Sequence, residues 1–170
     1  PLSLGSYIII FTSFCQMFII KNWIVLYIGV KIIIGDWFMK TIKDIDVTNK
    51  KVVIRVDYNV PMENGIIKDS SKIKKSLRSI NYLLENNCRV VILSHFGRIK
   101  SEEDKAKNSL KIVAKELANL LGKNVKFLDN CYGDKVKNIV DNCGLGEVIL
   151  LENTRFMDIY EKKESGNDLA

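Results

Sequence analysis

Short apolar runs alternate with amphipathic helical patterns along most of this chain, and no other feature constrains the fold as strongly. The strand-like runs are residues 52–56, 89–93, 125–128 and 147–151. Apolar residues at helical spacing follow the first three runs, in residues 73–84, 110–121 and 136–140. Short strands that are apolar on both faces are typical of a parallel sheet covered by helices on both sides. The predicted fold class is therefore α/β, a Rossmann-like three-layer arrangement around a parallel sheet.

Local signals indicate where the helices begin and end. Asp69, Ser70 and Ser71 offer capping oxygens before the first helix. Asn108 or Ser109 can cap the second helix, and Gly122 is expected to end it.

The first 38 residues differ from the rest of the chain, because they contain only three charged residues, Lys21, Lys31 and Asp36. The uncharged run 7–20 is shorter than the roughly 20 residues of a membrane-spanning helix. Lys21 then interrupts it, although tilting and snorkelling of this lysine would extend a span to about Val30. We expect residues 1–38 to be an extension outside the folded domain, either non-native upstream sequence or a membrane segment. A contribution to the core is the remaining alternative. The domain itself is predicted to cover residues 39–170.

Charge and cysteine content limit the classes of partner. A net charge of +6 and a pI near 9.1 suit nucleic acid, an anionic membrane, a small anionic substrate or simple solubility. The basic residues are scattered without an aromatic-basic motif, so we expect no nucleic-acid partner. The four cysteines form no CxxC pair and His95 is the single histidine, which argues against a metal site. Reduced thiols in the cytoplasm are expected, while a disulfide pair remains an open alternative.

Polar residues follow every predicted strand, in residues 57–59, 94–98, 129–130 and 152–156. Ligands of open parallel sheets bind beyond the carboxyl ends of the strands. Arg98 and Arg155 provide forked donors for phosphate or carboxylate, and Gly97 permits close backbone approach. This pattern predicts a site for a small anion. The alternatives are that the loops are merely solvated, that His95 is structural, and that Arg155 pairs with Glu152 or Asp158 at the surface.

Three motifs occur in these loops. The segment RVDYNVP at residues 55–61 resembles the RVDFNVP motif of the phosphoglycerate kinase family. SHFGR at residues 94–98 resembles its SHLGRP motif, and LLENTRF at residues 150–156 is identical to its third motif. The helix and strand between Ser109 and Phe127 also resemble that family. The resemblance runs from about Met39 to Ala170, and residues 1–38 show none of it.

The resemblance implies an incomplete amino-terminal domain of a two-domain kinase. The full enzyme would reversibly transfer a phosphoryl group from 1,3-bisphosphoglycerate to ADP in glycolysis, giving 3-phosphoglycerate and ATP. Mg-ATP or Mg-ADP would bind the missing carboxy-terminal nucleotide domain, so we expect this chain to bind 3-phosphoglycerate and no cofactor. A cytoplasmic monomer is the expectation from the family.

The resemblance also assigns roles to individual residues. Asp57 and Asn59 would contact the hydroxyl and carboxylate of the glycerate. His95, Arg98 and Arg155 would belong to the basic patch that holds the phosphate. The remaining substrate-binding positions in these motifs are Tyr58, Phe96 and Gly97.

Three features depart from the family pattern. Lys72 occupies the position of a family arginine that is thought to stabilise the transferring phosphoryl group, and lysine lacks the bidentate fork. Lys72 is thus a catalytic and substrate-binding candidate of altered chemistry. Ile99 replaces a proline, and the chain stops at Asp168-Leu169-Ala170 inside an expected helix. We expect the fragment alone to be inactive. The alternative function is a non-catalytic anion-binding α/β module, membrane-associated through residues 1–38.

Overall fold

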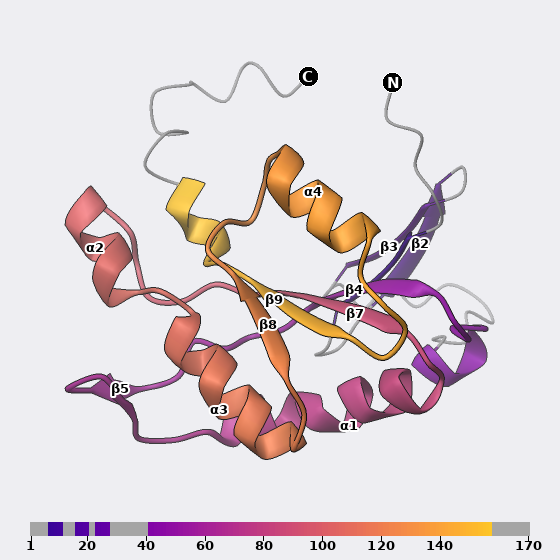
Figure 1. Ribbon diagram of the computed structural model, residues 1–170, viewed down its shortest axis with the longest axis horizontal. Coiled ribbons are helices and arrows are strands. Elements are labelled where there is room, and N and C mark those ends of the chain that lie inside the picture. Colours follow the sequence, from indigo (N-terminus) through magenta and orange to yellow (C-terminus); the bar gives the residue numbers. More distant parts are fainter. Residues whose placement is uncertain (1–6, 12–15, 21–22, 28–40, 158–170) are drawn as a thin grey trace.

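A central parallel sheet organises the molecule. The computed structural model describes residues 7–11, 16–20, 23–27 and 41–157. The sheet has the strand order β1-β4-β7-β9-β8, and every neighbouring pair is parallel (Figure 1). The strands are β1 (Tyr7–Phe11), β4 (Lys51–Arg55), β7 (Arg89–Leu93), β8 (Val125–Leu128) and β9 (Val148–Leu151). The four strands predicted from apolar runs are confirmed within one residue at each end.

Helices cover both faces of the sheet, as the three-layer prediction requires. Helices α1 (Ser71–Glu85) and α3 (Lys111–Leu121) lie on one face, and α4 (Asp134–Asp141) lies on the other (Figure 1). A short helix that the sequence patterns did not indicate, α2 (Glu102–Lys107), follows β7.

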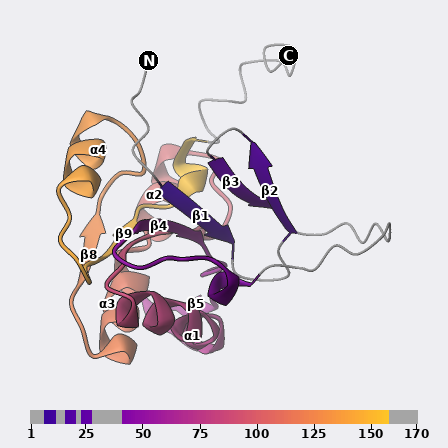
Figure 2. The ribbon, with the colours of Figure 1, turned by 90° about the vertical axis from the view of Figure 1, so that its right-hand side faces the viewer.

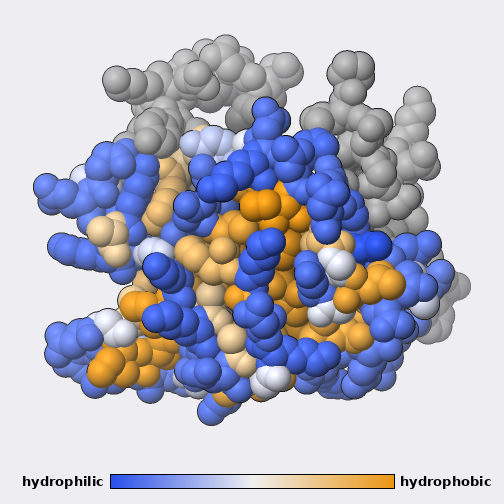
Figure 3. Space-filling view, viewed as in Figure 1, coloured by the Kyte–Doolittle hydropathy of each residue, from blue (hydrophilic) through white to orange (hydrophobic). Residues whose placement is uncertain are grey.

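Alternate residues of each strand contribute to two separate cores. Val90 and Ile92 of β7 belong to the larger buried cluster, with residues of α1 and α3. Val91 belongs to the second cluster, with Val136 and Val140 of α4. Because side chains alternate across a strand, a strand that serves both cores must be apolar at consecutive positions. This explains the continuous apolar runs in the sequence. On the face seen in Figure 3, hydrophobic side chains form a broad area across the middle that hydrophilic side chains cross and border.

Residues expected from the sequence hold the helix ends, although the N-cap position of α3 is Leu110. Ser70 is the N-cap of α1, but the carboxylate of Asp69 accepts the Ser71 N–H, at 2.8 Å. Gly122 ends α3 in the left-handed conformation, which confirms the predicted stop. The first turn of α3 is held by Ser109, whose Oγ accepts the Lys111 N–H at 3.2 Å.

Smaller elements surround the sheet. Strands β5 (Met62–Glu63) and β6 (Ile66–Ile67) form a hairpin, and β2 (Gln16–Ile20) pairs with β3 (Trp23–Tyr27). Two 3₁₀ turns are η1 (Ile42–Asp44) and η2 (Thr154–Met157).

Strand β1 of the amino-terminal segment lies beside β4 (Figure 2), with Tyr7 opposite Lys51 and Phe11 opposite Arg55. The rest of residues 1–38, apart from β2 and β3, lies outside the described residues, and so does the expected carboxy-terminal helix. In the described ranges no helix has the length and apolar character needed to cross a membrane. The membrane interpretation and the division at residue 39 therefore stay predictions.

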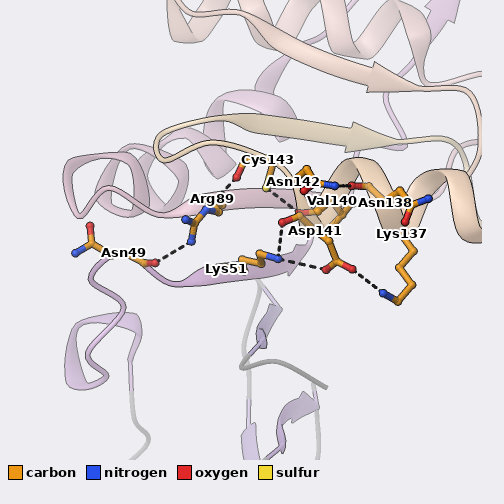
Figure 4. A network of polar contacts seen from close by, with 9 residues as sticks. All are labelled: Asn49, Lys51, Arg89, Lys137, Asn138, Val140, Asp141, Asn142 and Cys143. Carbon is orange, nitrogen blue, oxygen red and sulfur yellow. Dashed lines mark hydrogen bonds and ion pairs between the residues drawn. The ribbon is translucent and has the colours of Figure 1, made fainter. Parts of the chain in front are cut away.

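Lysine and arginine side chains tie the amino ends of the strands to the end of α4 (Figure 4). Lys51 Nζ donates to the Asp141 carbonyl at 2.9 Å and lies 3.2 Å from its Oδ1. Arg89 Nε donates to the Cys143 carbonyl at 3.0 Å. Carbonyls at a helix C-terminus lack intrahelical partners, so cations there are favourable. This network is structural and lies at the opposite end of the strands from the candidate site.

Candidate functional site

Ser94 joins the loops that leave β4, β7 and β9. Its buried Oγ donates to the Val56 carbonyl at 3.0 Å and accepts the Tyr58 N–H at 2.9 Å. The Ser94 carbonyl accepts the Thr154 N–H at 3.1 Å and the Thr154 hydroxyl at 3.2 Å. One serine thus connects the carboxyl ends of three neighbouring strands.

Asn153 makes a second connection between the loops after β7 and β9. Its side chain is fully buried and its Oδ1 accepts the Phe96 and Arg155 N–H groups, both at 3.1 Å. Its Nδ2 donates to the carbonyls of Phe96 at 2.6 Å and Asn108 at 2.9 Å. The loop 94–98 is therefore held through the backbone of Phe96 as well as through the buried side chain of Ser94.

Gly97 lies where these loops meet. Its N–H donates to Asn59 Oδ1 at 3.1 Å, and its carbonyl accepts a hydrogen bond from the Arg155 guanidinium. Its φ is +59°, and an added Cβ would lie 2.1 Å from Asn108 Oδ1. The conformation favours glycine here, and a Cβ at this position would have to displace the Asn108 side chain.

Asp57 and Lys72 form an ion pair at the edge of this cluster, with Lys72 Nζ 2.8 Å from Asp57 Oδ2. The other oxygen, Oδ1, accepts the Asn59 N–H at 2.9 Å. Partial burial opposes the charge of Asp57, but the bonds from Lys72 and the Asn59 amide outweigh it and lower its pKa. Asp57 is thus a carboxylate at neutral pH, and Lys72 on the first turn of α1 is directed to it.

His95 is surrounded by charged groups. Burial lowers the pKa of its imidazole, and Arg155, Arg55 and Lys72 lower it further, while Asp57 partly opposes them. Within the described ranges, His95 Nδ1 is the one buried side-chain N or O atom without a hydrogen-bond partner. A neutral imidazole beside several cations is a site where an added anion would be stabilised.

The remaining predicted residues lie in different surroundings. Tyr58 is fully buried in the larger core and its hydroxyl is 2.8 Å from Ser76 Oγ. Phe96 is also buried, so its backbone rather than its ring borders the loops. Arg98 is exposed and, among the described residues, makes no hydrogen bond or ion pair.

The loop after β8 does not join the cluster by any hydrogen bond within the described ranges. Asp129 lines a groove of about 700 Å³ between α3 and β8. The expectation that polar groups converge therefore holds for three loops of four.

Several residues of this region have a role that the sequence patterns do not indicate. Ser94, Asn153 and Arg55 stand inside the quoted motifs, but their buried partners and neighbouring charges were not apparent from their types. Glu152 is buried and bonds Ser109 Oγ at 2.6 Å and the Leu110 N–H at 2.8 Å. It thus caps α3 instead of pairing with Arg155. Its position three residues before Arg155 gives no signal of this contact.

The cations around His95 suit a small anion, whereas the described residues hold no cluster of metal ligands. There, no group of three or more His, Cys, Asp or Glu side chains converges. The described cysteines, Cys88, Cys131 and Cys143, are free thiols. The fold and the loops thus define an α/β protein with a candidate anion site at the carboxyl edge of its sheet.

Comparison with known proteins identifies the family. Residues 42–170 match the family model of phosphoglycerate kinase. Phosphoglycerate kinase of Fusobacterium nucleatum is 50% identical over 129 residues, which are 76% of this chain and 32% of the relative. The Enterococcus faecalis phosphoglycerate kinase is 48% identical over the same shares. The chain belongs to the phosphoglycerate kinase family.

Solved structures agree with this assignment. Phosphoglycerate kinase from Pyrococcus horikoshii matches with a TM-score of 0.61 and 30% identity, over 76% of this chain and 29% of that one. The enzyme from Coxiella burnetii matches with a TM-score of 0.56 and 34% identity, over 68% and 28%. The chain therefore spans about a third of the length of the relatives that it matches.

Proposed function

We propose that this chain supplies the 3-phosphoglycerate-binding part of a phosphoglycerate kinase. The observation that carries the proposal is the cluster in which Arg155 and Asn59 bond Gly97 beside His95. The family membership supports the substrate, and the surplus of cations supports an anionic ligand. Combined with a nucleotide-binding part, the chain would take part in reversible phosphoryl transfer from 1,3-bisphosphoglycerate to ADP.

Each residue type suits a part of this substrate. Arg155 keeps further guanidinium N–H donors for the phosphate, and Arg98 and His95 would add to them. Asp57 would accept the glycerate hydroxyl, and the amide of Asn59 would donate to the carboxylate. Lys72, paired with Asp57, would have to leave that carboxylate to reach the transferring phosphoryl group. Because lysine lacks the planar fork of the family arginine, Lys72 would stabilise the transition state less well, with a smaller effect on substrate binding.

Magnesium and nucleotide enter only as part of the proposal for the full enzyme. Among the described residues, no group of three or more His, Cys, Asp or Glu side chains could hold the metal. We propose that a separate nucleotide domain holds it and that this chain alone does not catalyse the reaction. A cytoplasmic monomer completes the proposal, and the free thiols fit that compartment.

Calorimetric titration of the 170-residue chain with 3-phosphoglycerate tests the proposal. Arg155→Gln should weaken binding by at least about tenfold, because hydrogen bonds to charged groups contribute about 1.5–3 kcal/mol. Lys126→Gln is the matched control, since it removes one charge at an exposed position on β8. Equal effects of the two substitutions would show that net charge, and not this site, attracts the ligand.

A further inference from the structure

We infer that Asn153 is a positioning residue: it sets the geometry of the anion site without touching the ligand. The inference rests on the proposed function for the identity of the ligand. Its side chain is fully buried and is directed at backbone atoms of Phe96, Asn108 and Arg155.

Asparagine is the residue type that fits this place. Two N–H groups face its Oδ1, and two carbonyls face its Nδ2. An amide carries one acceptor oxygen with two lone pairs and one nitrogen with two donors, so every bonding group of the side chain is used. Aspartate would place an oxygen against the carbonyls of Phe96 and Asn108. An apolar residue would leave four backbone groups, two of them buried and two partly buried, without this partner.

These bonds close a ring that passes through the candidate site. Asn153 holds both the N–H and the carbonyl of Phe96, which fixes the next residue, Gly97. It also holds the Arg155 N–H, and the Arg155 guanidinium returns to the Gly97 carbonyl. Gly97 in turn donates to Asn59 Oδ1, in the loop after β4. Through this ring one buried amide aligns Arg155, Gly97 and Asn59.

Asn153→Asp in the 170-residue chain tests the inference, because it keeps the shape and exchanges donor for acceptor. Two measurements are needed besides unfolding in urea: the affinity for 3-phosphoglycerate, and the NMR resonances of the Gly97 amide and the Arg155 Nε–H. Val140→Ala, on the far face of the sheet, is the control for general destabilisation. Asn153→Ser, which keeps one donor and one acceptor, replaces the aspartate variant if that one does not fold.

The expected result is a loss of affinity of at least about tenfold with displaced Gly97 and Arg155 resonances, while Val140→Ala changes neither. Unchanged affinity and resonances in a folded Asn153 variant would overturn the inference. If the unmodified chain does not bind 3-phosphoglycerate, the proposed function fails. The resonances then decide the positioning role alone: displacement supports it and an unchanged spectrum overturns it.

Discussion

At the scale of single residues, Gly97 is the most constrained position of the candidate site. Its positive φ and the nearby Asn108 side chain combine two separate costs for any larger residue. The left-handed conformation alone costs an L-residue about 1–2 kcal/mol. The contact with Asn108 adds a steric cost that depends on how far that side chain can move.

Gly97→Ala should therefore lower the free energy of unfolding by more than Gly122→Ala. Gly122 has a similar φ of +61°, but nothing lies within 4 Å of its added Cβ. Urea denaturation of both variants measures the difference. In the double variant Gly97→Ala/Asn108→Ala the extra loss should shrink. Equal losses in the two single variants would show that Asn108 does not restrict this position.

His95 should make stability depend on pH. Burial and Arg155 hold its folded pKa below the ordinary 6.5, so between the two values the unfolded chain binds more protons. The contribution of His95 to the free energy of unfolding is fully present above about pH 6.5. It is lost as the pH drops toward the folded pKa. We expect the free energy of unfolding to fall less between about pH 7.5 and about pH 5.5 for His95→Gln than for the unmodified chain. An identical decrease in the free energy of unfolding for the two proteins would contradict the burial of His95 among cations.

Residue types in the motifs predicted where charge gathers but not which atoms meet. Arg155 is predicted at the site from its type and its place after a strand, and Lys72 from the family resemblance. Their partners, the Gly97 carbonyl and Asp57, depend on how three loops pack together. The roles of Ser94, Asn153 and Glu152 arise from tertiary contacts between residues far apart in the sequence.

At the scale of elements, the end of α4 is fixed to the sheet through Asp141 (Figure 4). Lys51, on β4, bonds both the carbonyl and the carboxylate of Asp141 and is partly buried. Lys137, one turn earlier on α4, reaches the same carboxylate at 2.6 Å but is half exposed.

Lys51→Met should lower the free energy of unfolding by about 1 kcal/mol, as expected for loss of partly buried hydrogen bonds. Lys137→Met removes a more exposed ion pair with the same Asp141 carboxylate, so it should lower the free energy of unfolding by less. Thermal or urea unfolding of the two variants makes the comparison. A larger loss from Lys137→Met would contradict the view that the interelement contact holds α4 in place.

Elements with a strong apolar period were predictable, and those without one were not. The strands β7 and β9 and the helix α3 could be recognised because burial imposes their patterns. Helix α2 has the sequence EEDKAK, and no residue of it is buried, so it carries no amphipathic period. The hairpin strands β5 and β6 are two residues each, too short for alternation to be visible.

At the scale of the whole molecule, the outer edge of β4 is paired with β1 of the amino-terminal segment. The Val56 N–H donates a hydrogen bond to the Leu93 carbonyl of β7. Because N–H groups of a strand point alternately to its two neighbours, those of Val53 and Arg55 face β1. The N–H groups of Val52 and Ile54 face β7.

Removing residues 1–38 should thus speed hydrogen exchange at the Val53 and Arg55 amides. The Val52 and Ile54 amides are internal controls, and their exchange should stay unchanged because β7 remains in place. Amide exchange followed by NMR on both chains tests this pairing. Unchanged protection at Val53 and Arg55 would mean that β1 does not cover this edge in solution. Residues 1–38 would then lie outside the folded domain, as the sequence predicts.

We propose that three loops of this phosphoglycerate kinase family chain form a site for 3-phosphoglycerate around His95. The chain has one histidine, so its imidazole NMR signal reports on this site alone. A bound anion favours the protonated imidazole. Titration with 3-phosphoglycerate should therefore shift the His95 signal saturably and raise its pKa. A signal and pKa that stay unchanged at high ligand concentration would contradict the central claim.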